Sequence, residues 1–226
     1  MTLIDDALAQ TADFWRNYYT HNNQIHEPSP FARWCLEHHL PVGSHIVELG
    51  CGNGRDSFAF LHHGLPLLAV DGCEVVISNN AARCTVCEPE TCGHFLALDF
   101  SELDRLGPDD LAGVNAVYSR FVLHAIPEVL EDALLDFCQR ILLPGGRMLH
   151  EFRTLRDPMI QRGEKLSANE QFSDHYRRFL DPDTFRAKLA ARGWQELFFV
   201  ESNGLAPFGN DDPIVARVVA EKLPEH

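Results

Sequence analysis

From about residue 45 onward, short apolar runs rich in β-branched and aromatic residues alternate with amphipathic stretches. This alternation is typical of parallel strands joined by crossover helices. The apolar runs predict seven strands, at residues 45–49, 67–71, 95–99, 116–123, 147–152, 196–201 and 214–219. The amphipathic stretches predict helices at 55–63, 73–82, 128–141 and 183–192. We therefore expect an α/β fold with a doubly wound, mostly parallel sheet.

Two segments lie outside this alternation. Residues 3–19 are amphipathic and rich in aromatic residues, and residues 29–40 are expected to form a second helix, so we interpret 1–44 as a helical lid. Residues 157–180 are polar with few paired apolar positions, and we expect a mobile excursion on the substrate side that adds nothing to the core. With a cofactor-binding half at 45–156, and a helix and two strands at 181–226, these parts are expected to form a single domain.

Composition narrows the class of protein. The chain has 226 residues, of which 45% are hydrophobic, and this is enough for the core of one domain. A formal charge of −14 repels phosphate backbones, so no nucleic-acid partner is expected. No apolar run is long enough to cross a bilayer, and the acidic N-terminus does not resemble a signal peptide. We expect a cytoplasmic monomer or homodimer without a membrane partner.

The seven cysteines are expected to be packed thiols in a reducing compartment. Cys84, Cys87, Cys92 and His94 have the ligand types of a zinc site. Only one C-x-x-C occurs among them and a second knuckle is absent from the sequence, so no metal is predicted.

A glycine loop follows the first predicted strand. Gly50, Gly52 and Gly54 lie between this strand and a helix start, where side chains would keep a ligand away from the backbone. The loop therefore predicts a nucleotide-like ligand at the carboxyl edge of the sheet. Its G-x-G-x-G spacing differs from G-x-G-x-x-G, which disfavours a nicotinamide dehydrogenase. The other alternative is an ordinary α/β turn whose strand-end acids cap helices.

Acidic residues end the next two predicted strands. Asp71 ends the second strand about twenty residues after the glycines, which is where a ribose-binding carboxylate is required. Asp99 ends the third strand and is well placed to accept a hydrogen bond from the amine of an adenine ring.

The motifs E-L-G-C-G-N-G at 48–54, V-D at 70–71, L-D-F at 98–100 and L-P-G-G-R at 143–147 resemble class I S-adenosylmethionine-dependent methyltransferases, over most of residues 42–222. The resemblance implies methyl transfer on a seven-stranded sheet whose last strand is antiparallel. It also implies that the glycine loop contacts the methionine end of S-adenosylmethionine, Asp71 its ribose and Asp99 its adenine. Asn115 departs from the family, in which the fourth strand usually begins with Asp. The expected cofactor-binding residues are Glu48, Gly50, Cys51, Gly52, Gly54, Asp71, Gly72, Asp99, Phe100 and Ser119.

Three further segments, at 52–57, 119–126 and 175–179, look like those of small-molecule and surface-polysaccharide-associated methyltransferases. Ligands of open α/β sheets bind beyond the carboxyl ends of the strands, so a small-molecule acceptor is expected between strands four and five, the excursion and the first helix. The basic residues there favour an anionic acceptor, methylated at O, N or S. The expected acceptor-binding residues are Tyr19, Arg120, Glu151, Arg153, Tyr176, Arg177 and Arg178.

Several alternatives remain open at this point. The arginines could instead form salt bridges with Glu151, Glu201, Asp211 or Asp212. A hydroxyl acceptor would need a base, for which the candidates are His124, His175 and Tyr18, whereas a carboxylate, phosphate or thiolate would need none. His124 could equally be a packing histidine. The chain could also be a non-catalytic regulatory module that binds S-adenosylmethionine or S-adenosylhomocysteine, or an enzyme that methylates a macromolecule.

Overall fold

A computed structural model describes residues 3–87 and 93–224. Its main sheet has seven strands in the order β3-β2-β1-β4-β5-β10-β9. Strands β1 to β5 pair in parallel, and β10 pairs antiparallel with both β5 and β9. The predicted fold class is confirmed. The strands are β1 (Ile46–Leu49), β2 (Leu67–Asp71), β3 (Gly93–Ala97), β4 (Ala116–Arg120), β5 (Arg147–Arg153), β9 (Trp194–Ser202) and β10 (Val215–Lys222).

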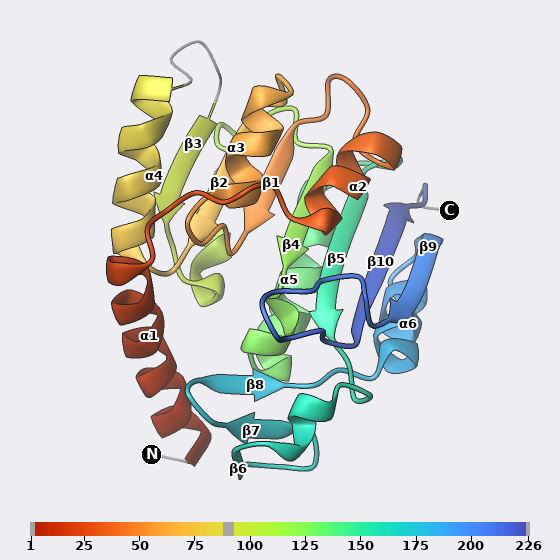
Figure 1. The fold of residues 1–226 in the computed structure, drawn as a ribbon. Coiled ribbons are helices and arrows are strands. Elements are labelled where there is room, and N and C mark those ends of the chain that lie inside the picture. The colour runs from red at the N-terminus through yellow and green to blue at the C-terminus, as the bar shows by residue number, and fades with distance from the viewer. Residues whose placement is uncertain (1–2, 88–92, 225–226) are drawn as a thin grey trace.

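Helices cover both faces of this sheet because side chains alternate along each buried strand. Ile46 of β1 faces one hydrophobic core with α2 (Pro30–His38), α3 (Arg55–His62) and α4 (Glu74–Cys87). Val47, the next residue, faces a second core with α5 (Glu128–Ile141) and α6 (Pro182–Ala191). The parallel strands end at the same edge of the sheet, which lies at the bottom of Figure 1.

Two strand boundaries differ from the prediction in a way that affects this edge. Strand β3 ends at Ala97, so Asp99 lies beyond the strand and caps the 3₁₀ helix η1 (Phe100–Arg105). Strand β4 ends at Arg120, because Phe121 adopts a φ of 62° and interrupts the extended backbone. The 3₁₀ helix η2 (Leu123–Ala125) then takes the place of the predicted end of the strand.

The prediction that residues 157–180 add nothing to the core is wrong. After the 3₁₀ helix η3 (Pro158–Gln161), this segment forms a three-stranded antiparallel sheet, β6 (Glu164–Lys165), β7 (Glu170–Phe172) and β8 (Tyr176–Arg178). Its apolar residues Tyr176, Phe179 and Leu180 are buried. The Leu180 amide donates to the Arg153 carbonyl (3.2 Å), so the segment joins the end of β5.

The predicted lid divides into two parts. Helix α2 belongs to the core, where Phe31 and Cys35 are fully buried, whereas α1 (Leu3–His21) lies at the carboxyl edge and contacts α4 and β8 (Figure 1). Thr11 fastens α1 to β8, because its hydroxyl accepts from the Tyr176 amide (2.7 Å) and donates to the Ala7 carbonyl (2.8 Å). Neither α1 nor any other helix of the described residues is long and apolar enough to span a membrane.

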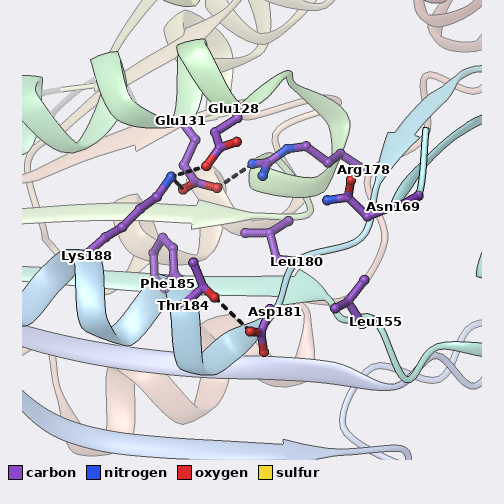
Figure 2. Close-up of a pocket in the computed structure, with 11 residues that line it drawn as sticks. Glu128, Glu131, Leu155, Asn169, Arg178, Leu180, Asp181, Thr184, Phe185 and Lys188 are labelled. Atoms are coloured by element: carbon purple, nitrogen blue, oxygen red, sulfur yellow. Dashed lines mark hydrogen bonds and ion pairs between the residues drawn. The ribbon is translucent and has the colours of Figure 1, made fainter. Parts of the chain in front are cut away.

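We predict that Glu131→Ala lowers the free energy of unfolding by about 3 kcal/mol, because it leaves the buried Arg178 guanidinium without its carboxylate, whereas Lys188 keeps Glu128 and Asp132. The buried Glu131 carboxylate accepts from Arg178 and from Lys188 (2.8 Å), as Figure 2 shows. Urea denaturation measures the loss. Asp104→Ala, which removes an exposed ion pair with Arg140, is the control and should change stability by less than about 1 kcal/mol. Equal losses in the two variants would contradict the prediction.

Candidate active site

The glycine loop after β1 has backbone conformations that favour glycine. Gly50, Gly52 and Gly54 have φ values of 75°, 50° and 81°, in the left-handed region. A Cβ on Gly50 would lie 2.3 Å from Val122 Cγ2, and one on Gly52 would lie 2.5 Å from Tyr19 Oη. The loop therefore exposes bare backbone to its neighbours at the carboxyl edge.

Asp71 ends β2 directly beside this loop. Its Oδ2 accepts from the Gly52 amide (2.9 Å) and its Oδ1 from the Cys73 amide (2.9 Å). Burial raises the pKa of Asp71, and the two amide hydrogen bonds oppose this shift. Each carboxylate oxygen keeps a second lone pair, so Asp71 can also accept hydrogen bonds from a diol.

Asp99, Gly72 and Phe100 extend the same surface toward β3. Asp99 is exposed, and its Oδ1 accepts from the amide (2.8 Å) and the hydroxyl (2.6 Å) of Ser101. Its Oδ2 lies 4.0 Å from the position that a Cβ on Gly72 would take. Phe100 Cζ lies 3.7 Å from the Cβ position of Gly50. The structure thus brings the glycines, Asp71, Asp99 and Phe100 to one edge.

Three other residues expected to bind the cofactor have their side chains elsewhere. Glu48 is buried beneath the loop and accepts from Ser57 Oγ (2.5 Å), and burial raises its pKa well above the usual range. Cys51 is also buried, and burial together with Asp71 raises the pKa of its thiol. Ser119 Oγ pairs with His150 Nδ1 (2.7 Å) among residues on the α5 side of the sheet. These buried side chains pack beneath the loop and the strand ends. The Ser119 hydroxyl is bound to His150, so its expected contact with the cofactor stays a prediction.

The C-terminal end of α1 lies over the loop. Tyr19 packs against Gly52, and burial, followed by the nearby Asp71, raises the pKa of its phenol. This contact places Tyr19 next to the glycine loop, and its expected role in binding the acceptor stays a prediction. Tyr18, its neighbour, is 38% exposed and packs edge-on against Tyr19 and Trp15.

The linker from α1 to α2 is fastened to the same loop. Asn53 Nδ2 donates to the Gln24 carbonyl (2.7 Å), and Arg55 Nε donates to the Glu27 carbonyl (2.9 Å). Arg83 of α4 donates to both oxygens of Asn23.

A buried carboxylate organises the acceptor side. Glu151 of β5 is fully buried and accepts from Arg120 Nε of β4 (2.9 Å) and Arg217 Nε of β10 (2.7 Å). Burial raises the pKa of Glu151 while the two guanidiniums lower it. Two cations share one anion, so this group carries a surplus positive charge next to the end of β4.

Phe121 connects Arg120 with His124, and the sequence analysis missed it. The Arg120 guanidinium lies 4.2 Å from the centroid of the Phe121 ring, and the His124 ring lies 5.1 Å from it. The positive φ of Phe121 turns the chain there, and a strained non-glycine residue next to a ligand site is a recognised functional feature. In the sequence, Phe121 is one more apolar residue in the run 116–123, and nothing there predicts the turn.

His124 is buried, and its Nδ1 accepts from the Arg153 amide (3.2 Å). Burial, followed by the charge of Arg153 and then of Arg177, holds the pKa of His124 well below its usual range. Its imidazole is therefore neutral at physiological pH.

The remaining arginines each have a carboxylate partner. Arg153 binds Asp157 (2.7 Å) and Asp211, and Arg177 binds Asp174 (2.7 Å). Asp211 is one of the carboxylates expected as alternative partners of these arginines, and it forms a salt bridge with Arg153. Arg178 binds Glu131 and two backbone carbonyls of the Leu123–Ile126 turn.

Strand alternation places the residues of β8 on opposite faces of the small sheet. Tyr176, whose hydroxyl donates to Glu170 (2.5 Å), and Arg178 lie on one face of β8, and Arg177 on the other. Arg178 and Tyr176 thus have partners within the chain, and their expected role in binding the acceptor stays a prediction. Gln171, which faces Arg177 in register, is a fully buried amide with no hydrogen-bond partner among the described residues, and no sequence motif indicates it.

His175 is the contact between the small sheet and α1. Its ring lies 4.7 Å from that of Phe14 and 4.6 Å from that of Trp15, and its Nδ1 lies 3.3 Å from Asp174 Oδ1. Burial and Arg177 lower the pKa of His175 to about 4. The neutral ring packs as an aromatic residue would.

A pocket of about 420 Å³ lies on the α5 and α6 side of the sheet, between these helices and the small sheet, and Figure 2 shows it. Its polar groups bind one another: Lys188 Nζ donates to Glu128 (2.7 Å) and Glu131 (2.8 Å), and Thr184 Oγ1 donates to Asp181 (2.8 Å). The pocket is therefore part of a structural ion network.

The geometry agrees with comparisons to known proteins. Residues 19–197 match the model of a family described as "Methyltransferase domain". The chain belongs to this methyltransferase family. A search of curated proteins finds no match.

Solved structures share the fold of this methyltransferase. The glycopeptide N-methyltransferase MtfA, in complex with S-adenosylhomocysteine, is 18% identical, with a TM-score of 0.64 over 87% of this chain and 90% of that chain. A methyltransferase from Methanosarcina mazei is 16% identical, with a TM-score of 0.64 over 84% and 97%. Magnesium protoporphyrin IX methyltransferase from Synechocystis PCC 6803, with bound S-adenosylmethionine, is 15% identical, with a TM-score of 0.60 over 84% and 76%.

The cofactor of this methyltransferase is S-adenosylmethionine, and the residues at the carboxyl edge fit it. The backbone of Gly50 and Gly52, which no side chain of their own covers, the second lone pairs of Asp71, and Asp99 beside the open Gly72 suit a methionine chain, a ribose and an adenine in that order. Tyr19 borders the space next to Gly52.

The expectation that Cys84, Cys87, Cys92 and His94 bind no metal stays a prediction. Cys92 and the side chain of Cys87 lie outside the described residues. Within the part of the chain that the structure describes, no group of three or more His, Cys, Asp or Glu side chains is arranged to hold a metal ion.

We predict that His175 makes the methyltransferase less stable as the pH falls from about 6.5 to about 4. The folded pKa lies below the unfolded one, so the unfolded chain binds more protons in this window, and above it the contribution is constant. His175→Phe keeps the ring packing and should remove this part of the pH dependence of the urea midpoint. His26→Phe, at an exposed residue, should follow the wild type. Parallel curves for wild type and His175→Phe would contradict the prediction.

Proposed function

We propose that this enzyme transfers the methyl group of S-adenosylmethionine to a small acceptor whose anionic group is bound by Arg120. The observation that carries the proposal is the sharing of the Glu151 carboxylate by Arg120 and Arg217. Arg120 uses Nε for Glu151, and its side chain is 17% exposed. The planar fork of a guanidinium suits a carboxylate or phosphate oxygen pair.

The other charges at this edge do not add to the surplus. Arg153 and Arg177 are paired with three carboxylates, those of Asp157, Asp211 and Asp174. Further inward, Asp56 accepts from Ser29 and Tyr118, and its charge acts on Arg55, Arg120 and Glu151. The surplus of one positive charge is therefore confined to the Glu151 group, in a chain whose formal net charge is −14.

S-adenosylmethionine supplies a methyl group that is already activated on a sulfonium, so the chain has mainly to align the acceptor and exclude water. In this proposal the glycine loop, Asp71 and Asp99 hold the cofactor, and α1 covers it. Arg120 orients the acceptor from the end of β4. The acidic surface and the acceptors for which two structural neighbours are named, a glycopeptide and magnesium protoporphyrin IX, support a small-molecule acceptor.

We expect Gly52→Ala to weaken S-adenosylhomocysteine binding about tenfold or more, because alanine is strained at a φ of 50° and its Cβ fills the space beside Tyr19. Isothermal titration calorimetry measures the affinity. Gly43→Ala is the matched control, since Gly43 has a φ of 89° but no atom within 4 Å of its Cβ position. Unchanged affinity in Gly52→Ala would refute the assignment of the loop.

We expect Arg120→Met to raise the acceptor KM about thirtyfold or more, the loss typical of a desolvated charged contact, with cofactor affinity unchanged. Methionine keeps the unbranched stem, and Arg217 remains to compensate Glu151. The acceptor comes from a screen of small carboxylates, phosphates, amines and alcohols with S-adenosylmethionine. Arg156→Met, which alters an exposed arginine paired with Glu201, should leave KM unchanged. Weaker cofactor binding with an unaltered acceptor KM would place Arg120 on the wrong ligand.

A further inference from the structure

We infer that the acceptor atom is a carboxylate oxygen, that its methylation uses no general base, and that His124 binds this carboxylate as a hydrogen-bond donor through Nε2. The inference rests on the proposed function and specifies its acceptor. It reverses the role of proton acceptor that a histidine after β4 suggests from sequence.

The hydrogen bond at Nδ1 fixes the tautomer of His124. A neutral imidazole has one nitrogen that donates and one that accepts. Nδ1 accepts from the Arg153 amide (3.2 Å), so the proton is on Nε2. The nitrogen that remains for a ligand is therefore a donor and cannot take a proton.

The groups that face His124 also prevent it from gaining a second proton. Arg120 faces it from β4, Arg153 from β5, and Arg177 and His175 from the small sheet, and the three arginine charges raise the free-energy cost of an imidazolium. The ring is buried, which acts in the same direction. His124 therefore stays neutral while it binds an anion.

The other groups near the Phe121 ring are no better as bases. His175 has a pKa of about 4 and is packed against Phe14 and Trp15. The carboxylates of Glu151, Asp157, Asp174 and Asp211 are each paired with arginine. Within residues 3–87 and 93–224, these groups are thus hydrogen-bond donors and compensated acids, and the acceptor side favours an acceptor that reacts without giving a proton to the protein.

A carboxylate satisfies this condition, and the charge of the site selects it over a phosphate. At the Glu151 group, where Arg120 is the partly exposed cation, the surplus is one positive charge, which matches a carboxylate, whereas a phosphate monoester carries about −1.5 to −2 near neutral pH. Arg120 and His124 border the same Phe121 ring and can hold one end of a flat anion. In the reaction one carboxylate oxygen forms a bond to the methyl carbon, the carbon–sulfur bond breaks, and its electron pair stays on sulfur. The negative oxygen and the positive sulfonium are both neutralised, so no proton has to leave.

The first test concerns the tautomer and needs no acceptor. In ¹⁵N-histidine-labelled protein, the His124 ring, assigned by its loss in His124→Asn, should show a bare Nδ1 and a protonated Nε2 from about pH 6 to about pH 8. Titration of this ring within that range, or a proton on Nδ1, would overturn the inference.

The second test is calorimetry of the S-adenosylhomocysteine-loaded protein with benzoate, phenyl phosphate and phenol. Benzoate should bind more tightly than phenyl phosphate, and phenol should not bind. His124→Asn keeps an acceptor for the Arg153 amide and a donor for the ligand, so it should retain benzoate binding. His124→Leu, which has neither, should lose it at least about fivefold, as for one hydrogen bond to a charged group. Equal affinities in the two variants, tighter binding of phenyl phosphate, or no binding of benzoate would overturn the inference.

The third test identifies the product. Methyl transferred from S-adenosyl-[methyl-³H]methionine to an acceptor found by the screen should be released as methanol in mild alkali, as from a carboxylate ester. An alkali-stable product would overturn the inference and leave the proposed function intact. Failure of the wild-type protein to bind S-adenosylhomocysteine would instead contradict the proposed function, so the two failures are distinguishable.

Discussion

The buried carboxylate of Glu151 is the interaction on which the acceptor edge depends. It lies on β5 and holds Arg120 of β4 and Arg217 of β10, so three adjacent strands end in one charged network. A buried carboxylate with a single cation would balance its charge locally, whereas two cations leave an excess of positive charge that favours an anionic ligand. The turn at Phe121 comes directly after Arg120 and places His124 beside the Phe121 ring. The positive charge of Arg120, the turn at Phe121 and the position of His124 are therefore fixed together.

The carboxyl edge is covered by two segments that are distant in sequence. Helix α1 comes before the sheet and the small sheet comes between β5 and α6, yet Thr11 and the His175 ring join them directly. Both contacts use polar residues in an unusual way: a hydroxyl completes the backbone bonding of β8, and a histidine packs as a neutral aromatic ring. These two contacts explain how the polar segment 157–180 can be well packed.

The sequence predicted the cofactor edge better than the acceptor edge, and the reason is physical. The glycine loop, Asp71 and Asp99 follow from local rules, because a strand must end before a loop and parallel strands end at one edge. The acceptor edge depends on partners that are far apart in sequence. Arg178 looks like a neighbour of Arg177 but faces the opposite side and binds Glu131, 47 residues away. The break at Phe121 lies inside an apolar run that is indistinguishable from a longer strand.

The fastening of the linker between α1 and α2 gives helix α1 two separate attachments. Asn53, Arg55 and Arg83 hold this linker next to the C-terminal end of α1. Thr11, Phe14 and Trp15 attach the rest of α1 to the small sheet. A substitution at one attachment would therefore loosen one part of the helix and leave the other in place, so the two ends of α1 can be perturbed independently.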